Sequence, residues 1–275
     1  MSFAEKISSA ETFLFVSAAQ PDRFEKAAEA GADVVIIDLE DAVASGLKSE
    51  SRRNVADHLL RSQCLVRINS AHSPYFDDDV AALAGSPGLI GVMLPKAEDV
   101  NELDQVAALF PGTPVVALIE SARGLDSARE IASHPAVVRL AFGNLDFAAD
   151  LGIAPGVEEN ELHYAFAHLV LAGRLADQAA PIAGVTTNFR EPLATASDAR
   201  RQKSFGFGGK LLIHPAQIQP TAEIFAPTAA EVEWARKVIS VSVAADGGAA
   251  QLDGAMIDRP VMLRAERITR GRGPV

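Results

Sequence analysis

One ten-residue stretch, Val115 to Gly124 (VVALIESARG), constrains the fold of this chain more than any other. Five apolar residues run directly into the carboxylate of Glu120, and a helical pattern follows. A strand this apolar is typical of a parallel sheet that is covered on both faces. The acid at its end is not needed for solubility, so we expect Glu120 to have a chemical role.

The same arrangement recurs along the chain, because several other apolar runs also end in polar residues. These are Asp38, Glu40 and Asp41 in VVIIDLED, Arg67 and Asn69 in LVRIN, Lys96 in VMLPK, and Asp146 in LAFGNLD. Buried parallel strands that each deliver a polar side chain at the carboxyl end build the active site of a TIM barrel. The pattern therefore indicates an active site assembled from several strands.

Strand-like and helix-like segments alternate from Thr12 to about Phe225, separated by short Gly and Pro turns. About eight such units in roughly 225 residues are the size of a TIM (β/α)8 barrel. We expect an α/β chain with the barrel over residues 1–226 and a C-terminal helical extension, or lid, over 227–275. The extension would pack on the barrel, on a neighbouring subunit, or on both. A doubly wound open sheet is the alternative.

The composition limits the classes of partner. A formal net charge of −11 argues against a general nucleic-acid or membrane-surface role, since those need a basic footprint. The apolar runs are too short to span a membrane, and the N-terminal residues do not resemble a signal peptide, so a cytoplasmic location is expected. Cys64 is the only cysteine, which excludes an internal disulfide.

Glu120 and Asp146 are predicted at the ends of adjacent strands, with no Cys or His cluster near them. Two carboxylates in this arrangement suit Mg²⁺, or Mn²⁺, with water and substrate completing the coordination. Solvated loop acids or helix N-caps are the alternative interpretation of either residue. Their shared position on buried strands favours the metal site.

Arg67 lies in an apolar strand, where a guanidinium needs a carboxylate or phosphate partner. We expect it to contact the substrate from the mouth that Glu120 also faces. A structural ion pair with Asp38 or Glu40 is the alternative. Asp38, Glu40 and Asp41 crowd three acids into four residues, so at least one of them should support the site from behind. His214, at the end of the last strand, is as consistent with a structural role as with a site contact.

Taken together, the motifs resemble the citrate lyase beta-subunit family of Mg²⁺-dependent acyl-CoA lyases, in the HpcH/HpaI aldolase superfamily. The resemblance covers essentially the whole chain. It is carried in order by LFV with PDRFEKA, GADVVIIDLEDAV, Lys48 with Arg52, VRIN, LPK, IESARG, FGNLD, GFGGKLLIHPAQI and DGAMIDRP. It implies a TIM barrel, often a trimer; a homotrimer or hexamer is expected here.

The resemblance also implies roles for particular residues. Glu120 and Asp146 look like the Mg²⁺ ligands, and Arg67 looks like the catalytic arginine that grips the oxygens of the keto-acid part. Asp258 resembles an acid that some members donate from the lid of an adjacent subunit. Gly143 and Asn144 of FGNLD are expected to bind substrate. Lys48, Arg52 and Lys96 are basic candidates for the phosphates of coenzyme A.

The implied reaction is the cleavage of a 3-hydroxyacyl-CoA, with (S)-citramalyl-CoA as the first candidate substrate. Citryl-CoA, malyl-CoA, or an acyl-carrier-protein thioester in a citrate lyase beta subunit are alternatives, as is a non-catalytic acyl-CoA-binding barrel. One departure bears on this choice: Ser17-Ala18-Ala19-Gln20 stands where the family commonly has Pro-Gly-x-Arg.

Overall fold

The structure is a computed structural model that describes residues 1–244, 250–252 and 254–270. The chain divides into two compact units, Met1–Ala222 and Glu223–Val275. Among the described residues, no helix is both long enough and apolar enough to cross a membrane.

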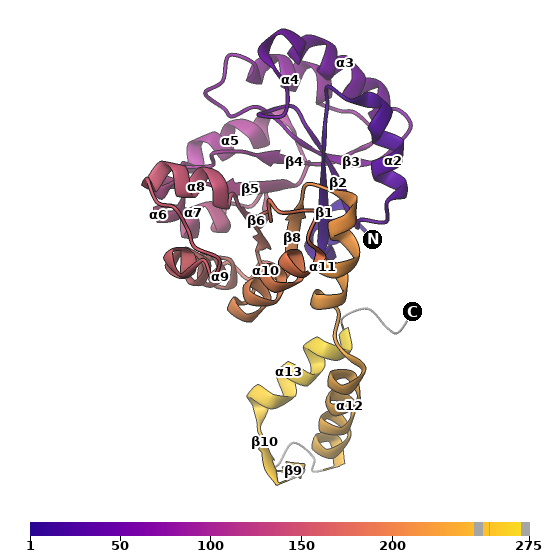
Figure 1. The fold of residues 1–275 in the computed structure, drawn as a ribbon, viewed down its shortest axis with the longest axis vertical. Helices are drawn as coiled ribbons and strands as arrows, with labels where there is room; N and C mark the ends of the chain where they lie inside the picture. The colour runs from indigo at the N-terminus through magenta and orange to yellow at the C-terminus, as the bar shows by residue number, and fades with distance from the viewer. Residues whose placement is uncertain (245–249, 253, 271–275) are drawn as a thin grey trace. The chain divides into compact units, whose positions relative to one another are not determined.

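The first unit is a closed barrel of eight parallel strands, in the order in which they occur along the chain (Figure 1). The strands are β1 Thr12–Ser17, β2 Val34–Asp38, β3 Cys64–Arg67, β4 Leu89–Leu94, β5 Val115–Ile119, β6 Val137–Phe142, β7 Ile182–Ala183 and β8 Gly209–Leu212. Residues of β8 pair with residues of β1 and close the sheet. The predicted TIM barrel is confirmed.

Helices alternate with the strands and surround them in Figure 1. They are α1 Phe3–Ser9, α2 Phe24–Glu29, α3 Lys48–Leu59, α4 Phe76–Leu83, α5 Val100–Leu109, α6 Ala122–Asp126, α7 Ala128–Ser133, α8 Asn144–Leu151, α9 His163–Leu175, α10 Pro192–Phe205 and α11 Ile218–Phe225. Short 3₁₀ turns lie at η1 Pro21–Arg23, η2 Ser45–Leu47, η3 Asn160–Leu162 and η4 Pro215–Gln217. Local signals fix several boundaries; α10 begins at Pro192 and ends at Phe205, immediately before Gly206, whose φ is +108°.

Side-chain alternation along the strands separates two apolar layers. One cluster contains Phe13, Ile36, Leu65 and Leu118 and fills the barrel interior. The larger cluster takes the intervening residues, such as Leu14 and Ile37, and packs them against the helices. Asp38, Arg67 and Glu120 continue the inward-facing series two residues after Ile36, Leu65 and Leu118. The alternation therefore directs all three polar groups into the barrel mouth.

The amino end of the barrel holds a feature that the sequence did not suggest. The buried guanidinium of Arg139, on β6, donates to the carbonyl oxygens of Ile7, Ala10 and Ala180 at 2.6 to 3.0 Å. Ile7 belongs to α1, which begins with a capping box between Ser2 and Glu5. Arg139 therefore ties the N-terminal helix to the barrel at the end opposite the mouth.

One sequence prediction near β6 needs correction. Strand β6 ends at Phe142 and α8 starts at Asn144, so Asp146 lies in the first turn of a helix and not at a strand end. The next strand, β7, covers only two residues, Ile182–Ala183. The Asn144 side chain accepts from Val185 N at 2.9 Å and donates to Val185 O at 3.1 Å, and so takes the bonds that a longer strand would make.

The second unit contains α12 Ala229–Ala244, an antiparallel hairpin of β9 Ala250–Leu252 and β10 Ala255–Ile257, and α13 Arg259–Arg270. Ala235, Val238, Ile257 and Ala265 form its buried centre, which Trp234 and other partly buried residues surround. The Arg264 guanidinium lies 4.8 Å from the centre of the Trp234 ring. This unit therefore has a small apolar core of its own.

Candidate active site

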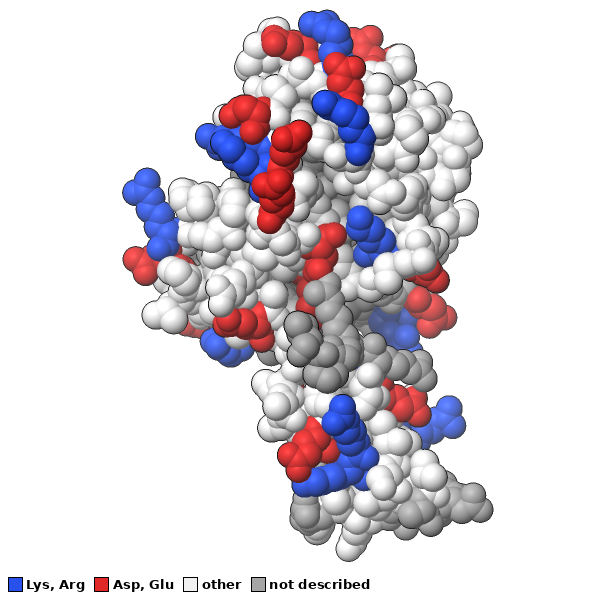
Figure 2. Space-filling view, turned by 90° about the vertical axis from the view of Figure 1, so that its right-hand side faces the viewer, with Lys and Arg blue, Asp and Glu red and all other residues white. Residues whose placement is uncertain are grey.

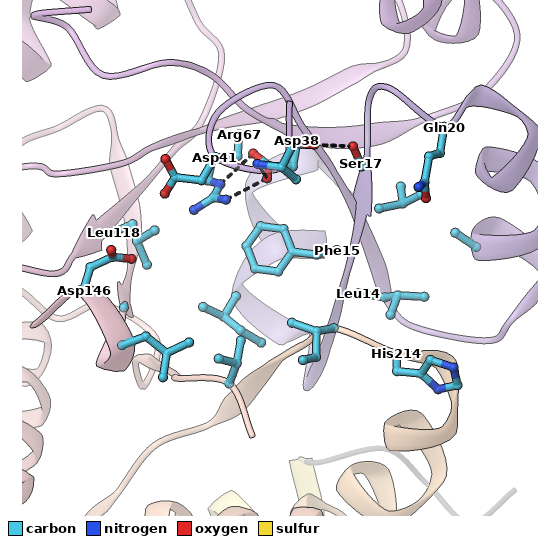
Figure 3. A pocket seen from close by; sticks show the side chains of 18 of the residues that line it. Leu14, Phe15, Ser17, Gln20, Asp38, Asp41, Arg67, Leu118, Asp146 and His214 are labelled. Atoms are coloured by element: carbon cyan, nitrogen blue, oxygen red, sulfur yellow. Dashed lines mark hydrogen bonds and ion pairs between the residues drawn. The ribbon is translucent and has the colours of Figure 1, made fainter. Parts of the chain in front are cut away.

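A cavity of about 800 Å³ opens at the carboxyl ends of the barrel strands. Its polar lining includes Ser17, Gln20, Arg23, Lys26, Asp38, Asp41, Arg67, Glu120, Asn144, Asp146 and His214. Phe15 lies in the middle of the view in Figure 3, below the Arg67–Asp38 pair, with Asp146 and His214 on opposite sides. Apolar walls with a few convergent charged groups are typical of a small-molecule site.

Arg67 is held in one orientation by two acids. Its Nε and Nη2 atoms each lie 2.7 Å from a carboxylate oxygen of Asp38, and its Nη1 lies 3.0 Å from Glu40. Burial alone would lower the pKa of Arg67, but the hydrogen bonds and charge of Asp38 outweigh it and raise that pKa. The guanidinium is thus a permanent, fixed cation that also lines the cavity. The ion pair considered as an alternative to a site role is present, and it orients the group for such a role.

Glu120 has the most strongly raised pKa among the acids of the site. Burial, and then repulsion by Glu40, raise the pKa of Glu120 to about 8, although Arg67 partly offsets them. Its Oε1 accepts a hydrogen bond from the backbone N–H of Lys96 at 2.8 Å. A buried carboxylate that is poorly stabilised in its charged form is suited to a ligand that brings positive charge.

Glu40 links the two cations of this region. One of its oxygens pairs with the Lys96 ammonium, and the other lies 3.0 Å from Arg67. Burial raises the pKa of Glu40 against the opposing effects of Arg67 and Lys96. Glu40 is not part of the cavity lining, whereas Asp41 and Asp38 are. Glu40 therefore lies behind the cavity lining and pairs with both Arg67 and Lys96.

The FGNLD segment brings three predicted residues to the cavity. Gly143, Asn144 and Asp146 all line it. The Asn144 amide is used by Val185, so its first role is to position the backbone after β7. Asp146 lies close enough to Glu120 to contribute to the raised pKa of Glu120. The two predicted metal ligands thus face the same space.

The structure does not bring Lys48 and Arg52 to the cavity. The buried Lys48 ammonium donates to Leu39 O, Glu40 O and Asn69 Oδ1 at 2.5 to 2.8 Å, which uses all three of its N–H bonds. Arg52 pairs with Asp79 at 2.7 Å and with Asp78 at 3.0 Å. Because their donors are taken by the protein, the phosphate role expected from the sequence does not fit either residue.

Two basic residues of the cavity were missed from the sequence. Arg23 and Lys26 are exposed on the turn and helix after β1 and line the cavity together with Gln20. Their spacing of three residues, directly after a strand of the barrel, was the available signal. On the face of the molecule that Figure 2 shows, acidic and basic side chains are interspersed.

The remaining candidates have partners of their own. His214 lines the cavity, accepts a hydrogen bond from Ala216 N at 3.1 Å and stacks on Phe189 with ring centroids 4.7 Å apart. Asp258 is exposed in the second unit and caps α13 by accepting from Val261 N at 3.2 Å. None of these contacts involves Glu120, Asp146 or Arg67.

The residues present fit a divalent cation that is bound partly by substrate. Among the described residues, no three His, Cys, Asp or Glu side chains converge as a complete metal site. Glu120 and Asp146 supply two carboxylates, and Asp38, Glu40 and Asp41 outnumber the nearby cations Arg67 and Lys96. Mg²⁺ is commonly held by one or two carboxylates, with waters and substrate oxygens as its other ligands.

Fold and site together define the class: a TIM-barrel protein with a carboxylate-rich cavity at the carboxyl ends of its strands, where barrel enzymes carry their active sites. The family model HpcH/HpaI aldolase/citrate lyase matches residues 11–215. The chain belongs to this family, and the resemblance drawn from the sequence motifs is confirmed.

Known relatives match nearly the full length. The citrate lyase subunit beta-like protein of Deinococcus radiodurans is 35% identical over 271 residues, covering 93% of this chain and 94% of the relative. A (3S)-malyl-CoA thioesterase of Cereibacter sphaeroides is 32% identical, with the same coverage. A crystal structure of CitE from Mycobacterium tuberculosis, in complex with magnesium, acetoacetate and coenzyme A, has a TM-score of 0.83 and 33% identity. The match covers 96% of this chain and 98% of that one.

Proposed function

We propose that this protein is a Mg²⁺-dependent carbon–carbon lyase that cleaves a 3-hydroxyacyl-CoA, with (S)-citramalyl-CoA as its first candidate substrate. The observation that carries the proposal is one cavity in which Glu120, Asp146 and the fixed cation Arg67 converge. The CitE structure with magnesium and coenzyme A supports both the metal and the thioester. The products would be acetyl-CoA and pyruvate.

Glu120 and Asp146 would hold the metal. Mg²⁺ bound there would supply Lewis-acid stabilisation of the substrate oxygens. Arg67 would neutralise negative charge on the same oxygens as the carbon–carbon bond breaks, and Asp38 would hold it in place at no cost of reorganisation. Asp258, which we propose is donated by the C-terminal lid of an adjacent subunit, would protonate the enolate carbon left on the thioester. The substrate hydroxyl would lose its own proton to solvent water as the carbon–carbon bond breaks, so the reaction releases one proton and consumes one.

We propose Arg23 and Lys26 as the phosphate contacts of coenzyme A, in place of Lys48 and Arg52. Both are exposed and line the cavity. Guanidinium and ammonium groups are the usual protein partners of phosphate oxygens. Gln20, beside them, carries no charge where the family commonly has arginine, so these two cations would provide the electrostatic contacts at this edge of the cavity.

A keto-acid release assay tests the proposal. Purified protein is mixed with citramalyl-, malyl- or citryl-CoA, each with Mg²⁺ and each with EDTA, and carbonyl products are trapped and quantified. We expect release of a carbonyl acid from at least one thioester, abolished by EDTA. No release from any of the three would contradict the proposal.

Thioester hydrolysis is a second candidate, because several relatives are named (3S)-malyl-CoA thioesterase. Hydrolysis would leave the acyl carbon skeleton intact and release free coenzyme A. The two activities therefore differ in which bond breaks, and the products distinguish them.

A further inference from the structure

Lys96 has an unusual backbone conformation at the edge of the site. Its φ is +50°, and in the described part of the chain only Glu159 and Asp177 share a positive φ among non-glycine residues. It follows β4 and Pro95. For a lysine this left-handed conformation is unfavourable, and such strain persists where the surroundings enforce it.

With this backbone conformation, the N–H and the side-chain ammonium of Lys96 each reach a different acid of the site. Its N–H donates to Glu120 Oε1 at 2.8 Å, while its ammonium pairs with Glu40. The next residue, Ala97, donates to Leu118 O at 3.2 Å and so attaches the turn to β5. The backbone N–H of Lys96 therefore hydrogen-bonds Glu120, whereas its ammonium pairs with Glu40 and acts on Glu120 through its charge.

Gly143 confines the same carboxylate from another side. A β-carbon at Gly143 would lie 2.5 Å from Glu120 Oε2 and 2.5 Å from its Cβ, far inside van der Waals contact. Gly143 is itself held by a 2.9 Å bond from its N–H to Ile119 O. Glu120 thus has one oxygen on the Lys96 N–H, and its other oxygen rests against the bare α-carbon of Gly143.

We propose that Lys96 is a positioning residue: its left-handed backbone directs the N–H that fixes the rotation of the Glu120 carboxylate. The ammonium is not needed for this function. The inference rests on the proposed function only in taking Glu120 as the metal ligand. A hydrogen bond to a metal-ligating side chain from a group that does not itself touch the metal holds that side chain in place, and this generally raises the metal affinity of a site.

Three substitutions separate the backbone from the ammonium. Lys96→Gly, Lys96→Asn and Lys96→Val all remove the charge. Gly and Asn accept a positive φ, whereas β-branched Val strongly disfavours it. The Kd of Mn²⁺ is measured on the metal-free full chain from the electron paramagnetic resonance signal of free Mn²⁺. Thermal unfolding without metal is recorded beside it.

We expect Lys96→Val to bind Mn²⁺ at least tenfold more weakly than Lys96→Gly, and Lys96→Asn to lie within threefold of Lys96→Gly. If the Lys96 side chain had only a structural role, the Gly and Asn variants would not both bind Mn²⁺ more tightly than the Val variant. Equal Kd values for the Gly and Val variants would overturn the inference while leaving the metal site intact. If wild-type protein binds no Mn²⁺, the metal site of the proposed function fails as well.

Should Lys96→Val not fold, Lys96→Ala takes its place. Alanine tolerates the left-handed region less well than glycine and adds only one methyl group. We then expect a Kd at least fivefold higher for Lys96→Ala than for Lys96→Gly, outside the threefold range expected for Lys96→Asn. Equal values would overturn the inference in the same way.

Discussion

At the scale of single residues, the site combines an acid that is costly to bury with groups that hold it still. Glu120 is 3% exposed, and burial together with repulsion by Glu40 raises its pKa to about 8. A group that weakens the fold and yet occupies the centre of a cavity is typical of functional sites, where stability and activity are in conflict.

Glu120→Gln should therefore stabilise the metal-free protein while abolishing metal-dependent activity. A raised acid pKa means that folding is penalised increasingly as pH rises from about 4.5 to about 8, since the folded state holds the proton more tightly. We expect the variant to gain roughly 1–3 kcal/mol over wild type at pH 8, in urea unfolding with EDTA, and less at pH 5. The exposed Glu25→Gln is the control and should change neither quantity. A destabilised Glu120→Gln protein would contradict this description of the site.

Gly143→Ala tests the packing against Glu120. The added methyl carbon would lie 2.5 Å from Glu120 Oε2 and would displace the carboxylate. We therefore expect the Kd of Mn²⁺ to be at least tenfold higher than in wild type. Gly156→Ala is the matched control, because a β-carbon there meets nothing within 4 Å. Equal Mn²⁺ affinity in the two variants would show that Gly143 is not needed for the carboxylate position.

At the scale of elements, strand alternation made much of the site predictable from sequence. Arg67 and Glu120 each lie two residues beyond an inward-facing apolar residue, and the apolar runs marked those strands clearly. Asp146 was misplaced because Gly143 reads as a continuation of β6, although α8 begins directly after it. The partners of Lys48 come from Leu39, Glu40 and Asn69, and no local pattern reveals such contacts. The positive φ of Lys96 is likewise set by its surroundings and not by its residue type.

Asn144 connects α8 to the segment after β7, and its amide replaces the missing strand pairing. Asn144→Ala should leave Val185 N–H and C=O without these partners and cost about 1–3 kcal/mol. Hydrogen exchange followed by mass spectrometry should show faster exchange in peptides covering Gly184–Thr187. Leu145→Ala, at a residue that is 52% exposed, is the control. Unchanged protection of that segment would argue against the proposed link.

At the scale of the whole molecule, the barrel buries charges that serve the fold and not the site. Lys210, on β8, is fully buried and donates to Gly184 O and Gln202 Oε1 at 2.5 and 2.7 Å. Arg139 performs a similar task at the amino end of the barrel. These cations lie outside the cavity lining, so they affect stability without direct contact with a ligand.

Burial lowers the pKa of Lys210 to about 8, so stability should depend on pH in alkaline solution. Between about pH 8 and 10.5 the unfolded lysine binds a proton that the folded one has lost, and stability therefore rises with pH. We expect the free energy of unfolding of wild type minus that of Lys210→Met to increase by up to about 3 kcal/mol from pH 7.5 to 10.5. Urea unfolding at several pH values measures this slope. A flat difference would mean that Lys210 stays charged in the fold.

We propose that a carbon–carbon bond, and not the thioester bond, is broken in the barrel mouth. The most direct measurement is mass-spectrometric quantification of products from citramalyl-CoA with Mg²⁺, for wild type and Glu120→Gln side by side. We predict acetyl-CoA and pyruvate in equal amounts from wild type and neither from the variant. Free coenzyme A with intact citramalate and no acetyl-CoA would contradict carbon–carbon cleavage and identify the protein as a thioesterase.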